Sequence, residues 1–459
     1  MPFTNEYASG ESLLSLANSQ AIKDFQASIR SIPPGRHPLP TVTPVHRTSW
    51  APTRVIAIDG SSITEPLRSG FPAADATLLK VSIVSIDLRR LNDSVEKDLI
   101  PSPRTFYDME KTAALDIVLP GANVVRQGIP DDTPRRFFRE TVYEAFSYQL
   151  DRTHENLLET LMQIGGPHDV TKTHSPVECC EGETMTPFST PVQACPCGKG
   201  TVYYTDALRF AERFSDVSSN GEAHGEVRHV LEVLALINML RFFATPERIS
   251  YLRDNVFVLD GPLALFGHPA WLTPYIRDEL CRINNLCRQH GFDLAVFGYE
   301  KTGAFVNHFE QLDFDEEHGP RAKLPVGTAM VLASEYINAN IALRPVDAKP
   351  HGADTYFGRK VFYKTRSGDH AVITTAMIDQ TNRDFANNTP TQRLGDMLNV
   401  LDHLSTYLYR DGFMPLIRAH AHAAIPLRRG VDIIRGLFEE TTTHLSPTTG
   451  GTTGSGHTY

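Results

Sequence analysis

Short apolar runs that end at turn-forming residues predict most of the strands in this chain. Two of these runs, VIAI and VFVL, are each followed directly by Asp-Gly. The predicted strands lie within residues 55–59, 77–88, 256–261, 293–303 and 359–378. The last of these segments changes character at Ser367-Gly368 and therefore predicts a hairpin.

Apolar residues spaced three to four apart predict the helices. The predicted helices lie within residues 1–30, 135–165, 205–214, 225–244, 275–291, 391–410 and 415–440. The segment 135–165 fits either one helix or two. The proline-rich residues 31–53 predict a linker or wrapping arm, and the low-complexity tail at 441–459 predicts disorder.

The order of these elements predicts an α/β fold with an RNase H-like core. Strands come first, and a helix, a strand, a second helix and another strand follow before the C-terminal helices. A strand–helix–strand crossover usually joins parallel neighbours. By fold-level analogy the first and fourth strands lie next to each other. We therefore expect a mixed sheet flanked by helices, with insertions, in which Asp59 and Asp260 lie side by side.

The overall charge argues against a protein that coats DNA. The 459 residues carry 44 Lys and Arg against 54 Asp and Glu, a net charge of −10. An acidic chain can still hold a local basic channel for nucleic acid. The longest apolar region, 230–244, is interrupted by Glu232, Asn238 and Arg241 and is too short to span a membrane. The first 20 residues lack the features of a secretory signal, so we expect a cytoplasmic protein without a membrane segment.

Three acids are candidates for a shared metal site. Asp59 and Asp260 each end an apolar run, and Glu232 lies in an apolar helix. Each has a simpler explanation: Asp-Gly is favoured at turns, and Glu232 lies four residues after Arg228, as in a surface ion pair. Neighbouring carboxylates are costly unless a cation neutralises them. Mg²⁺ and Mn²⁺ prefer oxygen ligands, and two such ions can hold a phosphodiester and activate water.

A cysteine-rich insertion at residues 165–204 is a candidate zinc site. Its four cysteines are Cys179, Cys180, Cys195 and Cys197. Four thiolates can bind Zn²⁺ tetrahedrally, and His174 can replace one of them. The adjacent pair and the single residue inside CPC depart from usual zinc spacing, so a loop of free thiols is the alternative. Cys281 and Cys287 lie on a predicted helix and are expected to pack.

Several motifs together resemble the NurA nucleases, which work with the HerA translocase. The blocks are VIAIDGSS, RHVLEVLALI, VFVLDGPL, FGYEKTGAF, DTYFGRKVFYKTRSG and MPLIRAHAHAAI, in family order between residues 54 and 437. The resemblance implies an N-terminal arm over residues 1–50, a NurA-like nuclease domain over 51–440 and a tail over 441–459.

The resemblance assigns roles to particular residues. Asp59, Glu232 and Asp260 would bind Mn²⁺ or Mg²⁺, and His420 would complete the site. His422 is the rival ligand, but residues two apart on a helix point in different directions. Phe413 and Met414 stand where the family often has a tyrosine, which leaves the role of that hydroxyl open. The expected phosphate-binding residues are Lys301, Arg359 and Lys360.

The implied function is metal-dependent cleavage of DNA by two ions. The family implies 5′-to-3′ exonuclease activity, with endonuclease activity as a further expectation, in DNA end processing or anti-phage defence. It also implies a homodimer and a HerA-like hexameric ATPase as partner, since the chain lacks a phosphate-binding loop for ATP. The alternatives are a non-catalytic DNA-binding adaptor of such a motor and an RNase H-fold nuclease acting on RNA or hybrids.

Overall fold

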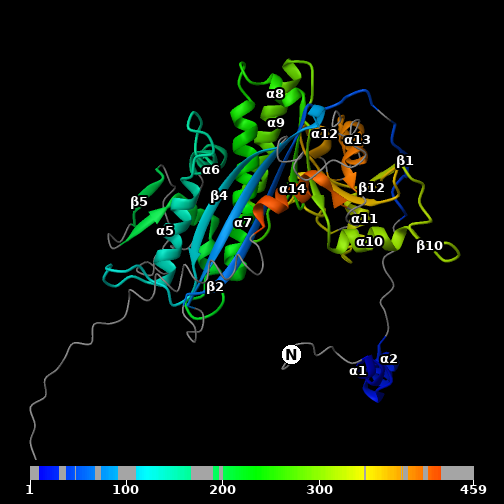
Figure 1. Ribbon diagram of the computed structural model, residues 1–459, viewed down its shortest axis with the longest axis horizontal. Helices are drawn as coiled ribbons and strands as arrows, with labels where there is room; N and C mark the ends of the chain where they lie inside the picture. The colour runs from blue at the N-terminus through cyan, green and yellow to red at the C-terminus, as the bar shows by residue number, and fades with distance from the viewer. Residues whose placement is uncertain are drawn as a thin grey trace, which may run out of the picture.

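The computed structural model describes residues 10–29, 38–46, 48–67, 74–90, 110–166, 190–195, 200–345, 348–383, 385, 391–406 and 412–424. In this part of the chain a nine-stranded mixed sheet lies between two layers of helices (Figure 1). The sheet order is β1-β11-β12-β13-β8-β7-β2-β3-β4.

The central strands have the predicted RNase H-like arrangement. A meander of antiparallel strands comprises β2 (Arg54–Pro66), β3 (Asp75–Asp87) and β4 (Glu110–Pro120). The later strands β7 (Asn255–Asp260) and β8 (Val296–Glu300) then run parallel to β2. The first and fourth strands of this core are therefore hydrogen-bonded neighbours, as the order of the elements predicted.

The hairpin predicted around Ser367-Gly368 extends the sheet beyond β8. It consists of β12 (Gly358–Lys364) and β13 (His370–Ala376), and β13 pairs with β8. Two shorter strands, β11 (Thr328–Val331) and β1 (Thr43–Pro44), complete this edge. Part of the proline-rich N-terminal segment thus joins the sheet as an edge strand.

Helices cover both faces of the sheet. Figure 1 shows α7 behind the long strands and α14 in front of them. The helices are α1 (Gly10–Ala17), α2 (Gln20–Ser28), α5 (Pro134–Phe146), α6 (Leu157–Gly165), α7 (Gly221–Phe243), α8 (Ser250–Arg253), α9 (Thr273–Gln289), α10 (Ala304–Leu312), α11 (Ser334–Asn340), α12 (Gln380–Arg383), α13 (Leu394–Leu404) and α14 (Met414–Ala423). Two-residue strands form two small hairpins, β9 (Phe314–Asp315) with β10 (Gly319–Pro320) and β14 (Ser405–Thr406) with β15 (Gly412–Phe413).

Alternation along β2 divides the core between the two faces of the sheet. Ile56 and Ile58 pack with α5, α6, α7 and α9, whereas Val55 and Ala57 pack with α13 and α14. Successive side chains of a strand point to opposite faces. Full burial of a Val or Ile side chain contributes roughly 1.5–3 kcal/mol to the free energy of folding. Because β2 is buried on both faces, its position is well fixed, and so is that of the residues that follow.

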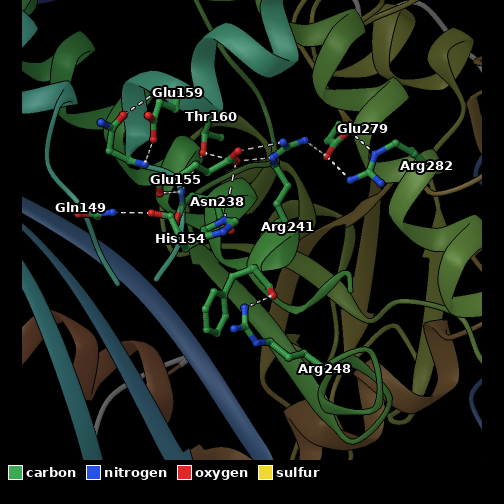
Figure 2. Close-up of polar contacts among 12 residues, drawn as sticks. Gln149, His154, Glu155, Glu159, Thr160, Asn238, Arg241, Arg248, Glu279 and Arg282 are labelled. Carbon is green, nitrogen blue, oxygen red and sulfur yellow. Dashed lines mark hydrogen bonds and ion pairs between the residues drawn. The ribbon is translucent and has the colours of Figure 1, made fainter. Parts of the chain in front are cut away.

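A buried polar network explains the polar residues that interrupt the apolar helix α7. Arg241 donates to Glu155 at 2.5 Å and also to Glu279 on α9, and Asn238 donates to the Glu155 carbonyl (Figure 2). Glu279 in turn accepts from Arg282 at 2.7 Å. Because each buried charge has a charged partner, the network joins α7 and α9 without leaving an isolated charge in the core.

Some predicted elements differ from the observed ones. The helix predicted at 205–214 is a pair of 3₁₀ turns, Tyr204–Leu208 and Phe210–Glu212, separated by Arg209 with φ of +62°. A left-handed residue interrupts helical hydrogen bonding. The segment 135–165 forms two helices, and the helix predicted at 391–410 ends at Leu404. Within the described residues, no helix is long and apolar enough to cross a membrane. The predicted tail at 441–459 lies outside them.

Candidate active site

The two Asp-Gly sequences meet at the junction between β2 and β7. The parallel register pairs Ile58 with Leu259, which places Asp59 and Asp260 at the next step along the two strands. Asp260 is the last residue of β7, whereas β2 continues past Asp59 for seven more residues, to Pro66. The turn interpretation of Asp59-Gly60 is therefore wrong, because Asp59 lies inside a strand and pairs with Ser82 of β3.

Glu232 reaches the same junction from α7 because Gly60 has no side chain. A Cβ on Gly60 would lie 2.1 Å from Oε1 of Glu232. Alternation along β2 places Gly60 on the face covered by α7 and Asp59 on the other face. The Glu232 side chain is buried, so its carboxylate lies against the bare backbone of β2. Glu232 was predicted from the sequence as a candidate, whereas the space that Gly60 provides was not.

Each carboxylate of the cluster contacts a cationic or titratable side chain. The Lys301 ammonium donates to Oδ2 of Asp260 at 2.8 Å. His420, on α14, has its Nδ1 2.9 Å from Oδ2 of Asp59. Glu232 has two such partners, Arg228 and His229, both on its own helix.

Arg228 and His229 lie one turn before Glu232 on α7. The Arg228 Nε is 3.3 Å from Oε1 of Glu232, and the His229 Nδ1 is 3.4 Å from Oε2. The predicted i, i+4 pair between Arg228 and Glu232 is therefore present, and it coexists with a place in the acid cluster. His229 was not identified from the sequence, although its i, i+3 spacing to Glu232 was available as a signal.

Electrostatics links the three acids. Burial, together with the negative charges of Asp260 and Glu232, raises the pKa of Asp59 from 3.8 to about 7. Lys301 and His420 oppose this shift in the Asp59 pKa. So high a pKa shows that burial and the neighbouring negative charges outweigh the positive charges at this site. The cluster would therefore gain from a bound cation, and an oxygen-rich donor set fits Mg²⁺ or Mn²⁺.

His420 and His422 occupy different positions on α14. The His420 side chain is 61% exposed and contacts Asp59 through one ring nitrogen, which leaves Nε2 directed away from that bond. His422 is half-buried. Of the two rivals, His420 is the residue that the structure brings to the acids.

The remaining candidates lie in different surroundings. Arg359 and Lys360 are buried on β12, and the Lys360 ammonium pairs with Glu300 and lies 4.4 Å from the centre of the Phe305 ring. Burial holds the pKa of Lys360 well below its usual range. A phosphate contact by Lys360 would require it to leave this pair, whereas Lys301 is already at the acid cluster.

The cysteine candidates are only partly described. Cys179, Cys180 and Cys197 lie outside the described residues, as does the substitute ligand His174. Cys195 is buried directly after β5 (Val192–Ala194), which pairs with β6 (Thr201–Tyr203). Cys281 and Cys287 are buried on α9, which confirms the prediction that they pack.

The described residues contain no group of three or more His, Cys, Asp or Glu side chains already gathered around one point as metal ligands. Lys301 and Arg228 instead approach the carboxylate oxygens of Asp260 and Glu232. The donor set fits a hard divalent cation by its chemistry, with three carboxylates and one imidazole. For a metal ion to bind, the Lys301 and Arg228 side chains would have to move away from the carboxylates.

A family model for the NurA domain matches residues 53–425, which include all four candidate ligands. The chain belongs to the NurA family. This confirms the resemblance inferred from the motifs. No sequence among curated proteins matches the chain.

Solved NurA structures resemble the chain only distantly. The crystal structure of the NurA nuclease from Sulfolobus solfataricus has a TM-score of 0.33 and 9% identity, covering 89% of each chain. A crystal structure of NurA has a TM-score of 0.25 and 11% sequence identity, and the match covers 94% of this chain and 97% of the other. A crystal structure of NurA with manganese has a TM-score of 0.23 and 10% sequence identity, and the match covers 93% of this chain and 95% of the other. The site residues therefore rest on the geometry of this chain.

Proposed function

We propose that this NurA-family protein is a metal-dependent deoxyribonuclease that hydrolyses phosphodiester bonds. The observation that carries the proposal is the cluster of Asp59, Glu232 and Asp260, supplied by two strands and a helix that are far apart in sequence. The raised pKa of Asp59 supports a site built for a cation. Membership of the NurA family supports a nuclease in particular.

The candidate residues divide into two proposed roles, metal binding and phosphate contact. Asp59, Glu232, Asp260 and His420 would hold Mn²⁺ or Mg²⁺, and two bound ions would supply charge neutralisation at the phosphate and a water of lowered pKa. Lys301, released from Asp260 when a cation binds, would contact a phosphate oxygen. Hydrolysis adds water across the P–O bond and leaves a phosphomonoester and a hydroxyl group.

The finer assignments follow the resemblance of the motifs. We propose 5′-to-3′ exonuclease activity together with endonuclease activity, a homodimer, and a HerA-like hexameric ATPase as the working partner, in end processing or anti-phage defence. The absence of an ATP-binding motif from the sequence supports an external motor. These assignments concern substrate choice and assembly, which are determined outside the acid cluster.

Cleavage assays test the central proposal. Purified protein is incubated with labelled single- and double-stranded DNA in Mn²⁺, Mg²⁺ or EDTA. We expect cleavage only with a divalent ion, and loss of at least roughly a hundredfold in rate for Asp59→Asn, comparable to removal of other single catalytic groups. Asp59→Asn should also raise the melting temperature in EDTA, because a neutral amide relieves the repulsion among the three acids. Metal-dependent cleavage by clean Asp59→Asn protein would falsify the site.

The two histidines of α14 provide a matched pair of variants. His420→Ala should lose most of the cleavage activity, because it removes the side chain 2.9 Å from Asp59. His422→Ala changes the same helix by the same residue type and should retain activity within about threefold, because residues two apart on a helix point in different directions. Rates and melting temperatures are measured for both. Equal activity losses in the two variants would contradict the assignment of His420.

A further inference from the structure

An exposed phenylalanine, Phe266, lies close to the acid cluster. Phe266 is 46% exposed, whereas Leu263, Ala264 and Leu265 just before it are fully buried. It lies in the segment that follows Asp260 directly in sequence, at the carboxyl end of β7. A single exposed apolar residue is ordinary on a protein surface. Phe266 differs in the contacts that hold its ring and in the residues next to it.

The ring of Phe266 rests on a residue that contacts a candidate metal ligand. It stacks with His229 at 6.3 Å between ring centres and 19° between ring planes. The Nδ1 of His229 is in turn 3.4 Å from Oε2 of Glu232. Tyr356 supports the Phe266 ring edge-on at 5.7 Å. The ring therefore lies one side chain away from the cluster that would hold the scissile phosphate.

Backbone contacts fix the segment that presents the ring. The Gly261 N–H donates to the Tyr299 carbonyl at 2.8 Å, and the Leu265 N–H donates to the Thr355 carbonyl at 2.8 Å. His229 Nε2 also lies 2.7 Å from the Ala264 carbonyl oxygen. A ring held in this way loses little conformational entropy when a ligand stacks on it.

The surroundings of Phe266 suit a nucleic-acid strand. Gly267, next in the chain, has φ of +69°, and a Cβ there would lie 2.3 Å from Glu226 Oε1 and 3.0 Å from Arg213 Nη2, so a paired arginine and glutamate adjoin the backbone that carries the ring. Arg228, next to His229 on α7, is one-third exposed and pairs with Glu232. Aromatic rings beside cationic side chains are the usual device for binding single strands, because every base offers a face for stacking.

We propose that Phe266 is the platform on which a base next to the scissile phosphate stacks, so that the enzyme holds an unpaired strand at the acid cluster. This inference rests on the proposed nuclease function and assigns a positioning residue to it. Stacking on one aromatic ring strengthens single-strand binding by about tenfold or more. The platform would therefore act on substrate binding rather than on the hydrolytic step.

A binding experiment separates this inference from cleavage. Full-length Asp59→Asn protein is titrated in EDTA with a single-stranded oligothymidylate carrying 2-aminopurine, whose fluorescence is quenched by stacking. We expect quenching that Phe266→Ala abolishes, with an increase in Kd of about tenfold, and that Phe266→Trp restores. Phe314→Ala is the matched control, because Phe314 is 51% exposed on the distant β9 strand. It should behave like the parent protein.

Cleavage kinetics give the second measurement. In the active protein, Phe266→Ala should raise KM for single-stranded DNA with kcat nearly unchanged, and an abasic substrate should remove the difference between the two proteins. Unchanged quenching and KM in Phe266→Ala overturn the stacking platform while leaving the nuclease proposal intact. Phe266-dependent quenching without any metal-dependent cleavage would support the platform and contradict the nuclease proposal.

Discussion

Two glycines that follow an aspartate have different physical roles in this protein. Gly261 has φ of +101°, a conformation that favours glycine, and it ends β7 after Asp260. Gly60 lies in the middle of β2 and pairs with Val81 of β3. Its importance is steric, because the Glu232 carboxylate occupies the space that any larger residue would need.

Gly60→Ala should therefore disable the site. The added methyl group would lie 2.1 Å from Oε1 of Glu232, so Glu232 must move away from Asp59 and Asp260. We expect a loss of cleavage of at least roughly a hundredfold, with a stability cost of about 1–3 kcal/mol for overpacking. Rates and urea unfolding are measured on the same preparations.

Gly225→Ala is the control for this substitution. Gly225 lies on α7, and nothing lies within 4 Å of an added Cβ. Alanine should raise the free energy of unfolding by roughly 0.5–1 kcal/mol through helix propensity and leave cleavage unchanged. A Gly60→Ala protein as active as Gly225→Ala would show that Glu232 does not need its observed position.

The chemistry of the site was more predictable from the sequence than its supporting contacts. Asp59 and Asp260 follow recognisable apolar runs, and Glu232 is an acid in an apolar helix. Gly60 and His229 were not identified, because their roles depend on which helix covers which face of β2. That packing is a tertiary property, and spacing along one segment does not contain it.

At the scale of elements, α7 carries both the candidate catalytic acid Glu232 and a buried histidine with a structural role. His224 is 2% exposed. Its Nδ1 is 2.6 Å from the Thr77 hydroxyl on β3, and its Nε2 is 3.2 Å from the Pro120 carbonyl at the end of β4. A neutral ring satisfies both contacts by accepting from Thr77 and donating to Pro120. The histidine thus ties the helix to two strands.

This arrangement predicts acid sensitivity of the fold. Burial lowers the pKa of His224 to about 4, against about 6.5 in the unfolded chain. As the pH falls from 6.5 towards 4, His224 becomes protonated in the unfolded chain but stays neutral in the folded protein. The free energy of unfolding should therefore fall, by up to about 3 kcal/mol from this residue. Urea unfolding at several pH values measures it, and His224→Gln should reduce the slope between pH 6.5 and 4. Parallel curves for both proteins would contradict this account.

A further prediction is that the cysteine-rich segment around the β5–β6 hairpin binds zinc. The Cys195 N–H donates to the Gly200 carbonyl at 2.8 Å, and the Cys195 side chain is buried. We expect about one zinc ion per chain by elemental analysis, as for a structural site with four ligands. Cys195→Ser should lose the zinc, whereas Cys281→Ser, on α9, should keep it. Zinc-free protein from a preparation without chelators would leave the segment as a loop of thiols.

Periodicity predicted most elements correctly but not all of their ends. The run at 55–59 proved to be the first part of a strand reaching Pro66, because pairing with β3 continues past the point where β7 ends. The apolar spacing at 205–214 did not produce a helix. Asp206 there accepts from the Tyr203 N–H and from Arg139, and these contacts favour a tight turn over a continuous helix.

On the scale of the whole molecule, the site lies where two parts of one sheet meet. The antiparallel meander of β2, β3 and β4 provides Asp59, and the parallel strands β7 and β8 provide Asp260 and lead to Lys301. Helices on opposite faces add Glu232 and His420. Repulsion among neighbouring acids reduces the stability of the fold. The large core on both faces of β2 offsets this loss of stability. A residue set so dispersed in sequence is brought together only by the tertiary fold.

The last prediction concerns a motor outside this chain. Processive degradation of duplex DNA needs strand separation or translocation, and the sequence contains no ATP-binding motif. We expect a HerA-like hexameric ATPase to form a complex with this protein in size-exclusion chromatography and to accelerate duplex cleavage with ATP. A non-hydrolysable ATP analogue should leave the complex intact but remove the acceleration. Asp59→Asn should join the complex without cleaving DNA, because it changes one buried side chain. If no complex forms and cleavage is the same with and without the ATPase, the nuclease works without such a motor.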